Sequence, residues 1–529
     1  MPKARGDRFR YLALLVLAGF VLLWARALQL AVFEHAEHLE AAREQQTELT
    51  WIPSLRGPIL DRSGDPLALS VDGSSLAVDP ALLSDADSLA ETLDSLGIVA
   101  APRVRALLDA SGAKRFVWLT RGAVAEKTAR MLQRRFFPAV IRLREPKRLY
   151  PLGSSAAPLL GATGVDGDGL LGIEARYQRF LRGVDGRMLD FRSGSTRKHL
   201  GPGRVILSAP RIGATVELTI DARCQQIVSA HLAAAVEEQE ARGGTAILLD
   251  SRTGEVLALA SMPGFHPESI RTADSLALRN WAVNEAYEPG STYKLVAFAA
   301  ALDSGLITPD DWIDCHNGRR RVPGGVIHDH ERHQMLRVWE VLAHSSNIGT
   351  GIIAELVGAE GFYDMERRLG FGVTTGVEIS GEGRGRIPEP STWSKRSLVT
   401  QAFGQEVSCT ALQLAAAYGA VANGGLLMRP YLVREVRRQD GTILERREPE
   451  IVRRALRPQT ARALREMMRL VITEGTGKNA EVEGRLPAGK TGTSQKFITD
   501  EGHYSSEHYI ASFAGFAPVS YTHLRAHET

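Results

Sequence analysis

Ser291 and Lys294 are spaced so that a nucleophile and a base can meet on one face of a helix. Pro289-Gly290 precedes the pair and an apolar run, 295–302, follows it, which predicts a helix that begins near Ser291 and is buried on nearly all sides. Ser291 would lie in the first turn, where free backbone N–H groups stabilise a developing oxyanion. Burial near a second cation lowers the pKa of a lysine, so Lys294 could accept the serine proton. The pair therefore predicts nucleophilic catalysis by Ser291.

A second segment with the same spacing, 195–198 (STRK), provides an internal comparison. It lies among Gly194, Gly201 and Gly203 and no apolar run follows it, which is typical of a loop. The spacing alone is therefore weak evidence. Without further support, a helix-capping serine and a surface lysine would be the better explanation of Ser291 and Lys294.

The triplet Ser345, Ser346 and Asn347 falls between two helical patterns, 336–343 and 348–357. We therefore expect a short turn between helices, from which Ser345 and Asn347 can point the same way into a cleft. A plain helix N-cap is the more common meaning of such a triplet when it stands alone.

A strand pattern opens at Lys490, Thr491, Gly492 and Thr493. Gly492 has no side chain, so a peptide substrate could lie against the strand edge there. A turn is the more common meaning of this segment by itself. The three groups together, in this order, are much harder to attribute to chance.

The N-terminus combines a basic segment, 1–10, with an apolar run over 11–33 that Arg26 interrupts. This run exceeds the about 20 residues that a helix needs to cross a bilayer. A cleavable signal peptide is the alternative, but its apolar core would be shorter and would end at a small-residue cleavage site. We expect an uncleaved transmembrane helix at 11–33, with a cytoplasmic tail before it and nearly the whole chain outside the cytoplasmic membrane.

Two regions after the anchor predict an α+β fold. Residues 34–215 alternate helical and strand patterns. Residues 216–518 begin with a strand, a helix at 225–238 and a hairpin at 245–260, continue mostly helical to Ala422, and return to strand patterns near Ala488. Strands at both ends of this second region predict one sheet closed by the two ends, with helices between them.

Composition excludes some classes of function. The 64 basic and 61 acidic residues leave a formal net charge of +3, which provides no global field for nucleic acid. Three distant cysteines, Cys224, Cys315 and Cys409, predict no disulfide framework. One cluster contains residue types that can bind zinc: Cys315, His316, His328, His330 and His333. Because its spacing matches no standard zinc-ligand pattern, we expect no metal there.

The set S-x-x-K, S-x-N and K-T-G, in this order, resembles the penicillin-binding proteins and serine β-lactamases. Further motifs are similar to the monofunctional, class B penicillin-binding proteins, and the resemblance covers most of residues 11–518. These motifs are Arg56-Gly57 with Asp61-Arg62 and Gly64, RLYP at 148–151, GIE at 172–174, LTID at 218–221 and TGE at 253–255. Asn347 and the segment 314–333 are similar to the septal, cell-division members, whereas elongation members typically carry Asp at the position of Asn347.

The resemblance implies an elongated pedestal or dimerisation-type domain over 34–215 and a penicillin-binding transpeptidase domain over 216–518. It implies a peptidoglycan D,D-transpeptidase that acts on stem peptides ending in D-Ala-D-Ala, is inhibited by β-lactams and needs no cofactor. A membrane-bound SEDS-family glycan polymerase and other division proteins would be its partners. The tail 519–529 (VSYTHLRAHET) departs from the family pattern of a further core strand and helix and is expected to be non-native.

The same resemblance assigns roles to the residues of the three motifs. Ser291 would attack the penultimate carbonyl and Lys294 would take its proton. The backbone N–H groups of Ser291 and Thr493 would form the oxyanion hole. Ser345 would relay a proton to the leaving D-Ala and Asn347 would orient Lys294 and the substrate amide. The terminal carboxylate would be held by Lys490, Thr491 and Thr493.

Three other classes remain as alternatives beside an elongation-type role. A β-lactamase would need a deacylating base and would not need the segment 34–215. A non-catalytic β-lactam sensor would keep Ser291 but normally has several membrane spans and a cytoplasmic effector region. A bifunctional synthase would add a glycan-polymerising domain, for which 34–215 shows no pattern.

Overall fold

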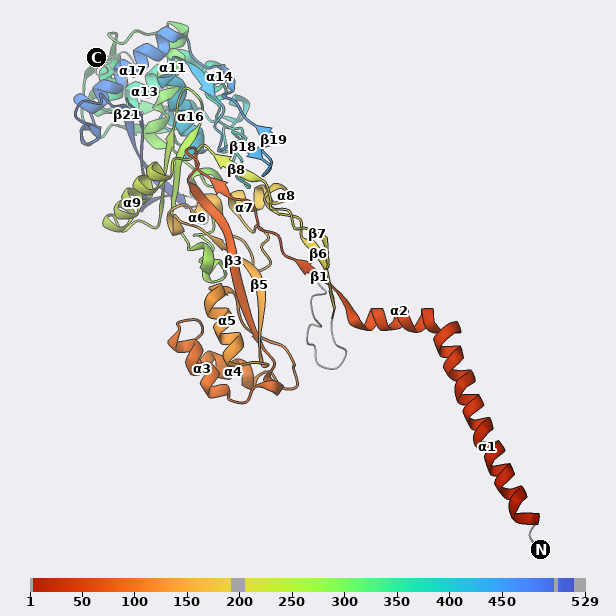
Figure 1. The fold of residues 1–529 in the computed structure, drawn as a ribbon. Coiled ribbons are helices and arrows are strands. Elements are labelled where there is room, and N and C mark those ends of the chain that lie inside the picture. The colour runs from red at the N-terminus through yellow and green to blue at the C-terminus, as the bar shows by residue number, and fades with distance from the viewer. Residues whose placement is uncertain (1–2, 192–204, 499–502, 518–529) are drawn as a thin grey trace, which may run out of the picture. The chain divides into compact units, whose positions relative to one another are not determined.

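The computed structural model describes residues 3–191, 205–498 and 503–517 (Figure 1). The comparison segment 195–198 and the tail 519–529 lie outside the described residues. The chain divides into two compact units, one of residues 1–55 with 183–212 and one of residues 56–182 with 213–529. The predicted domain division into 34–215 and 216–518 stays a prediction.

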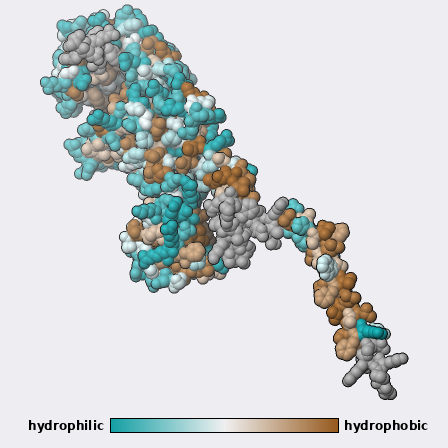
Figure 2. Space-filling model, in the orientation of Figure 1, coloured by the Kyte–Doolittle hydropathy of each residue, from teal (hydrophilic) through white to brown (hydrophobic). Residues whose placement is uncertain are grey.

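The first unit contains the apolar N-terminal helix. Helix α1 (Lys3–Leu28) continues into a π-helical turn, Gln29–Phe33, and α2 (His35–Gln46) follows. The stretch Phe9–Phe33 is long and apolar enough to cross a membrane, and none of its most apolar window is buried. Figure 2 shows this helix as an apolar column. An exposed apolar surface of this kind matches the predicted membrane anchor.

The same unit holds a three-stranded antiparallel sheet in the order β1-β6-β7. Its strands are β1 (Thr47–Ile52), β6 (Gly186–Phe191) and β7 (Val205–Ser208). The strands come from chain segments on either side of the second unit's 56–182 portion, so this small sheet is closed by long-range pairing.

The second unit is built on a seven-stranded sheet, in which β19, β18, β8, β2, β3 and β4 follow one another and β5 also pairs with β3. Only the β2–β8 pair among these is parallel. The strands are β2 (Ile59–Leu60), β3 (Pro66–Val78), β4 (Val117–Val124), β5 (Val140–Leu149), β8 (Thr215–Leu218), β18 (Val433–Arg437) and β19 (Ile443–Arg446).

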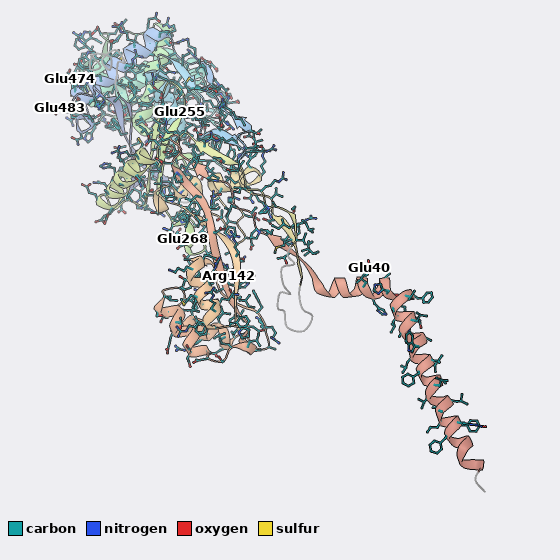
Figure 3. The ribbon with its side chains drawn as sticks, in the orientation of Figure 1. Glu40, Arg142, Glu255, Glu268, Glu474 and Glu483 are labelled. Carbon is teal, nitrogen blue, oxygen red and sulfur yellow. The ribbon has the colours of Figure 1, made fainter. Side chains whose placement is uncertain are left out.

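Three helices cover the β3–β4–β5 end of this sheet and close a small core around Leu76, Leu89 and Leu132. They are α3 (Ala86–Ser95), α4 (Ala101–Asp109) and α5 (Glu126–Arg135). Arg142 on β5, labelled in Figure 3, donates to Glu126 at 2.7 Å and so fastens α5 to the sheet.

Three charged residues near the sheet, Arg56, Arg148 and Glu174, form a buried network of ion pairs. Glu174, which is fully buried, accepts from Arg56 Nε at 2.5 Å and from Arg148 Nε at 2.8 Å. Arg148 also donates to the carbonyl oxygen of Gly57 at 2.8 Å. A buried carboxylate with two paired cations avoids the cost of an isolated charge. These residues belong to the motifs at 56–57, 148–151 and 172–174, so the motifs meet in space.

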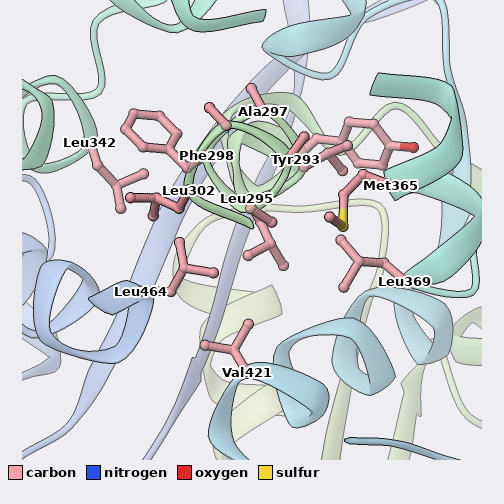
Figure 4. Close-up of a cluster of buried hydrophobic side chains, with 14 of the residues drawn as sticks. Tyr293, Leu295, Ala297, Phe298, Leu302, Leu342, Met365, Leu369, Val421 and Leu464 are labelled. Atoms are coloured by element: carbon pink, nitrogen blue, oxygen red, sulfur yellow. The ribbon is translucent and has the colours of Figure 1, made fainter. Parts of the chain in front are cut away.

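The helical part of the second unit surrounds α11 (Leu295–Ser304), whose first eight residues are all buried. Figure 4 shows this helix among apolar side chains, including Leu342, Leu369 and Leu464, from the helices around it. The surrounding helices are α12 (Val338–Ala343), α13 (Asn347–Val357), α14 (Ala359–Arg368), α15 (Ser397–Ala402), α16 (Ala411–Ala422) and α17 (Pro458–Thr473). The predicted buried helix after Ser291 is confirmed.

The strands at the two ends of this region differ from the predicted single sheet. The hairpin β9 (Gly244–Leu249) and β10 (Val256–Met262) is one two-stranded sheet, and β21 (Ala488–Ile498) and β22 (His503–Phe516) form another. Both β9 and β22 contact α16. The helix predicted at 225–238 is confirmed as α9 (Ala222–Glu238), which packs on β10. Among the described residues, the two ends are therefore joined through a helix and not through a shared ladder.

Short hairpins interrupt the region that was expected to be helical. They pair β12 (Trp312–Asp314) with β15 (Met335–Arg337), and β13 (Arg319–Val322) with β14 (Gly325–His328). After α16, β17 (Leu426–Met428) pairs with β20 (Ile451–Arg454), so strands return well before Ala488. Segments this short have too few residues to show a two-residue period.

Candidate active site

Ser291 lies in a short 3₁₀ turn, Gly290–Lys294, that leads directly into α11. Two glycines permit the close packing of this turn. Gly404, at φ +80°, would place a Cβ 2.2 Å from the carbonyl oxygen of Gly290, so no larger residue fits there. Gly290 itself has φ +58° and lies against Thr493 and Ser494 of β21. The turn that carries Ser291 is thus fixed against the strand that carries the third motif.

A second serine lies between Ser291 and Lys294. The Ser345 hydroxyl donates to Ser291 Oγ at 3.1 Å, and Lys294 Nζ donates to Ser345 Oγ at 3.1 Å and also to the Ser345 carbonyl oxygen. Among the described contacts, Ser345 therefore bridges the nucleophile and the lysine. The sequence placed Ser345 in the same cleft but did not predict this intermediate position.

Lys294 and Lys490 are two buried lysines of one site. Lys294 is 0% exposed, and burial together with the nearby charge of Lys490 holds its pKa well below the usual range, while Asp329 acts in the opposite direction. Burial also lowers the pKa of Lys490, to about 7. Lys490 Nζ donates to the Thr491 carbonyl oxygen at 3.0 Å. A lowered pKa favours the neutral form that can accept a proton, so it suits the role predicted for Lys294, and that role stays a prediction.

The loop that carries Ser345 is held by Asp329, a residue to which sequence reasoning gave no role of its own. One carboxylate oxygen of Asp329 accepts from the backbone N–H groups of Asn347 and Ile348 at 2.6 and 2.9 Å, and the other accepts from the Ser346 hydroxyl at 2.5 Å. Asp329 thereby caps the N-terminus of α13. Ser345 has φ +60°, a conformation that this capped loop must maintain.

Asn347 has a different partner from the one that was predicted. Its side-chain amide donates to the carbonyl oxygen of His328 at 3.3 Å. The expected contact with Lys294 is not among the hydrogen bonds of the described residues. Asn347 thus joins α13 to the end of β14, and its role toward Lys294 and the substrate stays a prediction.

The third motif occupies the start of β21 with alternating orientation. Lys490, Gly492 and Ser494 are buried, whereas Thr491 and Thr493 are more accessible. A Cβ on Gly492 would lie 2.5 Å from Ser512 Oγ and 3.0 Å from the Pro289 carbonyl oxygen, so the glycine is required for packing against the serine turn. Two hydroxyls therefore face outward beside a buried cation, which suits an anionic group.

Glu288 links the serine turn to neighbouring segments and was not predicted. Its Oε1 accepts from the Glu406 backbone N–H at 3.0 Å and from the Tyr504 hydroxyl at 3.1 Å. Its carbonyl oxygen accepts from the Ser494 hydroxyl at 2.7 Å. The only sequence signal was its position three residues before Ser291.

The fold and the site together define a serine acyltransferase: a serine at the head of a buried helix, a bridging hydroxyl and a buried lysine. Comparison with protein families agrees with this class. The penicillin-binding protein transpeptidase domain matches residues 244–524, and the penicillin-binding protein dimerisation domain matches residues 51–194. The chain belongs to the class B penicillin-binding proteins, as its motifs predicted.

Curated relatives match over nearly the whole chain. Penicillin-binding protein PbpB of Mycolicibacterium smegmatis is 34% identical over 542 residues, which cover 95% of this chain and 83% of the relative. Peptidoglycan D,D-transpeptidase FtsI of Escherichia coli is 30% identical, over 97% of this chain and 85% of the relative. A crystal structure of penicillin-binding protein 3 of Mycobacterium tuberculosis with aztreonam has a TM-score of 0.68 and 30% identity, and the match covers 89% of this chain and 88% of that one.

Proposed function

We propose that this protein is a peptidoglycan D,D-transpeptidase of the division septum, in which Ser291 forms an acyl-enzyme with stem peptides and with β-lactams. The observation that carries the proposal is the hydrogen-bonded chain from Ser291 through Ser345 to the buried Lys294. The names of the relatives FtsI, PbpB and PenA, and the β-lactam complexes among the similar structures, support the same activity.

In the acylation step, Ser291 Oγ attacks the carbonyl carbon of the penultimate D-Ala, or of a β-lactam ring. Its proton passes to Ser345 while Ser345 gives its own proton to neutral Lys294, because the bridging hydroxyl is both acceptor and donor. The C–N bond then breaks, and the leaving nitrogen takes a proton back through Ser345.

We expect the developing oxyanion to bind the backbone N–H groups of Ser291 and Thr493, and the packing of Gly290 against Thr493 supports this assignment. The terminal carboxylate of the donor peptide binds at Thr491, Thr493 and protonated Lys490. The donor peptide lies along the accessible side of β21, where Gly492 lets the strand pack closely against the serine turn, and Asn347 orients the substrate amide. An amine of a neighbouring stem peptide then attacks the acyl-enzyme, which restores the Ser291 hydroxyl.

The setting of this reaction follows from the anchor and the relatives. The basic residues in the first turns of α1, at the N-terminal end of the apolar run, favour an N-terminus in the cytoplasm, with the catalytic unit on the outer side of the cytoplasmic membrane. Asn347, the segment 314–333 and the likeness to FtsI support the septal role. A membrane-bound SEDS-family glycan polymerase is the proposed partner of the anchor helix. An elongation-type role with the same chemistry is the second candidate.

Ser291→Ala should abolish covalent labelling by a fluorescent penicillin, because the variant lacks the attacking oxygen. The label is detected on a denaturing gel and located by peptide mapping. Ser195→Ala, in the comparison segment of identical spacing, is the matched control and should label like the parent chain. Loss of the label in Ser195→Ala with retention in Ser291→Ala would show that the nucleophile has been assigned to the wrong serine.

A further inference from the structure

Three metal-ligating side chains gather beside the Ser345 loop, and the acyl-transfer chemistry does not use them. Glu331 and His333 lie in the segment between β14 and β15, and His344 follows the last residue of α12. One ligand atom from each lies within 4.8 Å of the other two. This set differs from the cluster weighed in the sequence, of which it keeps only His333.

The geometry directs both histidines at one carboxylate. Glu331 Oε2 lies 3.2 Å from His333 Nε2 and 4.0 Å from His344 Nδ1. The two imidazole rings are 5.0 Å apart, centre to centre, and are inclined by 35°. Their nitrogens thus point into one small volume from two different chain segments.

The chemistry of this donor set suits a divalent transition metal ion. Two imidazoles and a carboxylate are a common zinc ligand set, and zinc–nitrogen bonds of about 2.0–2.1 Å place tetrahedral ligands about 3.4 Å apart. Glu331 and His333 already lie within this spacing at 3.2 Å, whereas Glu331 and His344, at 4.0 Å, must approach by roughly 0.6 Å. Glu331 can make this movement at low cost because its side chain is 63% exposed, whereas the histidine side chains, 27% and 31% exposed, are more firmly held.

Cys315 is excluded from this set by its surroundings. It is fully buried, and its sulfur lies 3.5 Å from the Ser346 hydroxyl oxygen. Burial raises the pKa of its thiol, which opposes the thiolate form that binds metals. The expected ligands are therefore nitrogen and oxygen only, which favours zinc or cobalt over softer thiophilic ions.

We propose that Glu331, His333 and His344 form a binding site for one divalent transition metal ion of the zinc type. An ion there would join the segment that begins with Asp329 to the residue immediately before Ser345. It would therefore connect the two chain segments that fix the Ser345 hydroxyl, without itself touching Ser291 or Lys294. The ion would be bound by the residues beside the Ser345 loop and would take no part in the acyl transfer.

The test uses the full chain in detergent micelles, first stripped of metal with a chelator and then titrated with Co²⁺. A site of this kind should bind one Co²⁺ per chain with the visible absorption of a four-coordinate ion, and one equivalent of Zn²⁺ should displace it. His333→Gln and His344→Gln should each weaken Zn²⁺ binding at least about tenfold in competition with a chromogenic chelator.

His316→Gln is the matched control, because His316 lies in the same region but its nearest acidic partner is Asp314. It should bind Co²⁺ and Zn²⁺ like the parent chain. Thermal unfolding of each metal-free variant verifies that the fold survives. The proposal is overturned if the parent chain shows no saturable site, if His333→Gln and His344→Gln both bind like the parent, or if His316→Gln alone loses the ion. A Glu331 that merely pairs with protonated histidines would give the first of these results.

Discussion

The proposed mechanism requires opposite protonation states of Lys294 and Lys490. Lys294 must be neutral to accept a proton, whereas Lys490 must be charged to hold a carboxylate. The pKa of Lys294 is well below its usual range because of burial and Lys490, and burial lowers the pKa of Lys490 to about 7. The second-order rate constant of acylation should therefore follow a bell-shaped pH profile with a falling limb that begins near pH 7. Stopped-flow measurement with a fluorescent penicillin tests this.

Two variants separate the limbs of that profile. Lys490→Arg keeps a charge at every accessible pH, so its falling limb should disappear. Lys294→Arg cannot supply a neutral base and should lower acylation by several orders of magnitude at all pH values. A parent profile that is flat from about pH 6 to about pH 9, a range that includes the Lys490 pKa of about 7, would contradict the assigned roles.

Glu366 on α14 has no role in the proposed reaction but makes the stability of the fold depend on pH. It is fully buried and accepts from the Tyr293 hydroxyl at 2.9 Å, and burial raises its pKa to about 8. Because the folded pKa exceeds the unfolded one, its contribution to stability is complete below about pH 4.5 and is lost as pH rises through about 8. The free energy of unfolding of the parent chain should therefore fall by about 1 kcal/mol or more over this window. Glu366→Gln should remove that slope in urea unfolding, and an unchanged slope would exclude Glu366 as its source.

At the level of elements, one carboxylate determines how α13 presents the second motif. Asp329→Asn removes the charge that accepts from three donors at the head of α13. Hydrogen bonds to a charged group contribute about 1.5–3 kcal/mol, so acylation should fall at least about tenfold. Asp314→Asn, in the same region but bonded to His316 and Gln334, should acylate normally.

The pH profile of Asp329→Asn distinguishes positioning from simple loosening of the loop. Asp329 raises the pKa of Lys294 through its charge, so its removal should move the rising limb of the acylation profile to lower pH. Loosening alone would reduce the rate without moving that limb. An unshifted profile at normal rate would mean that α13 is capped sufficiently by the Ser346 hydroxyl oxygen, which accepts from the Gly349 backbone N–H at 2.9 Å.

For the whole molecule, the prediction concerns where the enzyme acts. If the septal assignment is right, depletion of the protein in its own host should produce long filaments with unfinished septa, because side-wall synthesis continues while division stops. Microscopy with a fluorescent D-amino acid records both processes. A plasmid copy with Ser291→Ala should fail to restore division, whereas a copy with Ser195→Ala should restore it. Round cells that still divide would indicate the elongation role and leave the acyl-transfer chemistry intact.

The residues predicted from sequence were those whose local pattern carries the signal. Ser291 was distinguished from Ser195 by the apolar helix that follows it, and that helix is buried as expected. The roles of Asp329 and Glu288 could not be predicted, because each depends on contacts with residues that are distant in the sequence and meet only in the folded chain. The single predicted sheet was replaced by two hairpins for a related reason: the strand patterns show where strands lie but not which edges meet.

The length and continuous pairing of strand β3 also predict that this part of the chain is stiff (Figure 1). Its first residues pair with β2, at Ala68 opposite Ile59, and from Leu69 to Val78 every residue is in register with β5. One continuous backbone therefore serves as the common member of both ladders, with no free linker between them. Bending β3 at this point would disturb the hydrogen bonds around Leu69 in both ladders. We therefore expect β3 to behave as a stiff element when force is applied along it. Compliance in this part of the chain must come from elsewhere than β3.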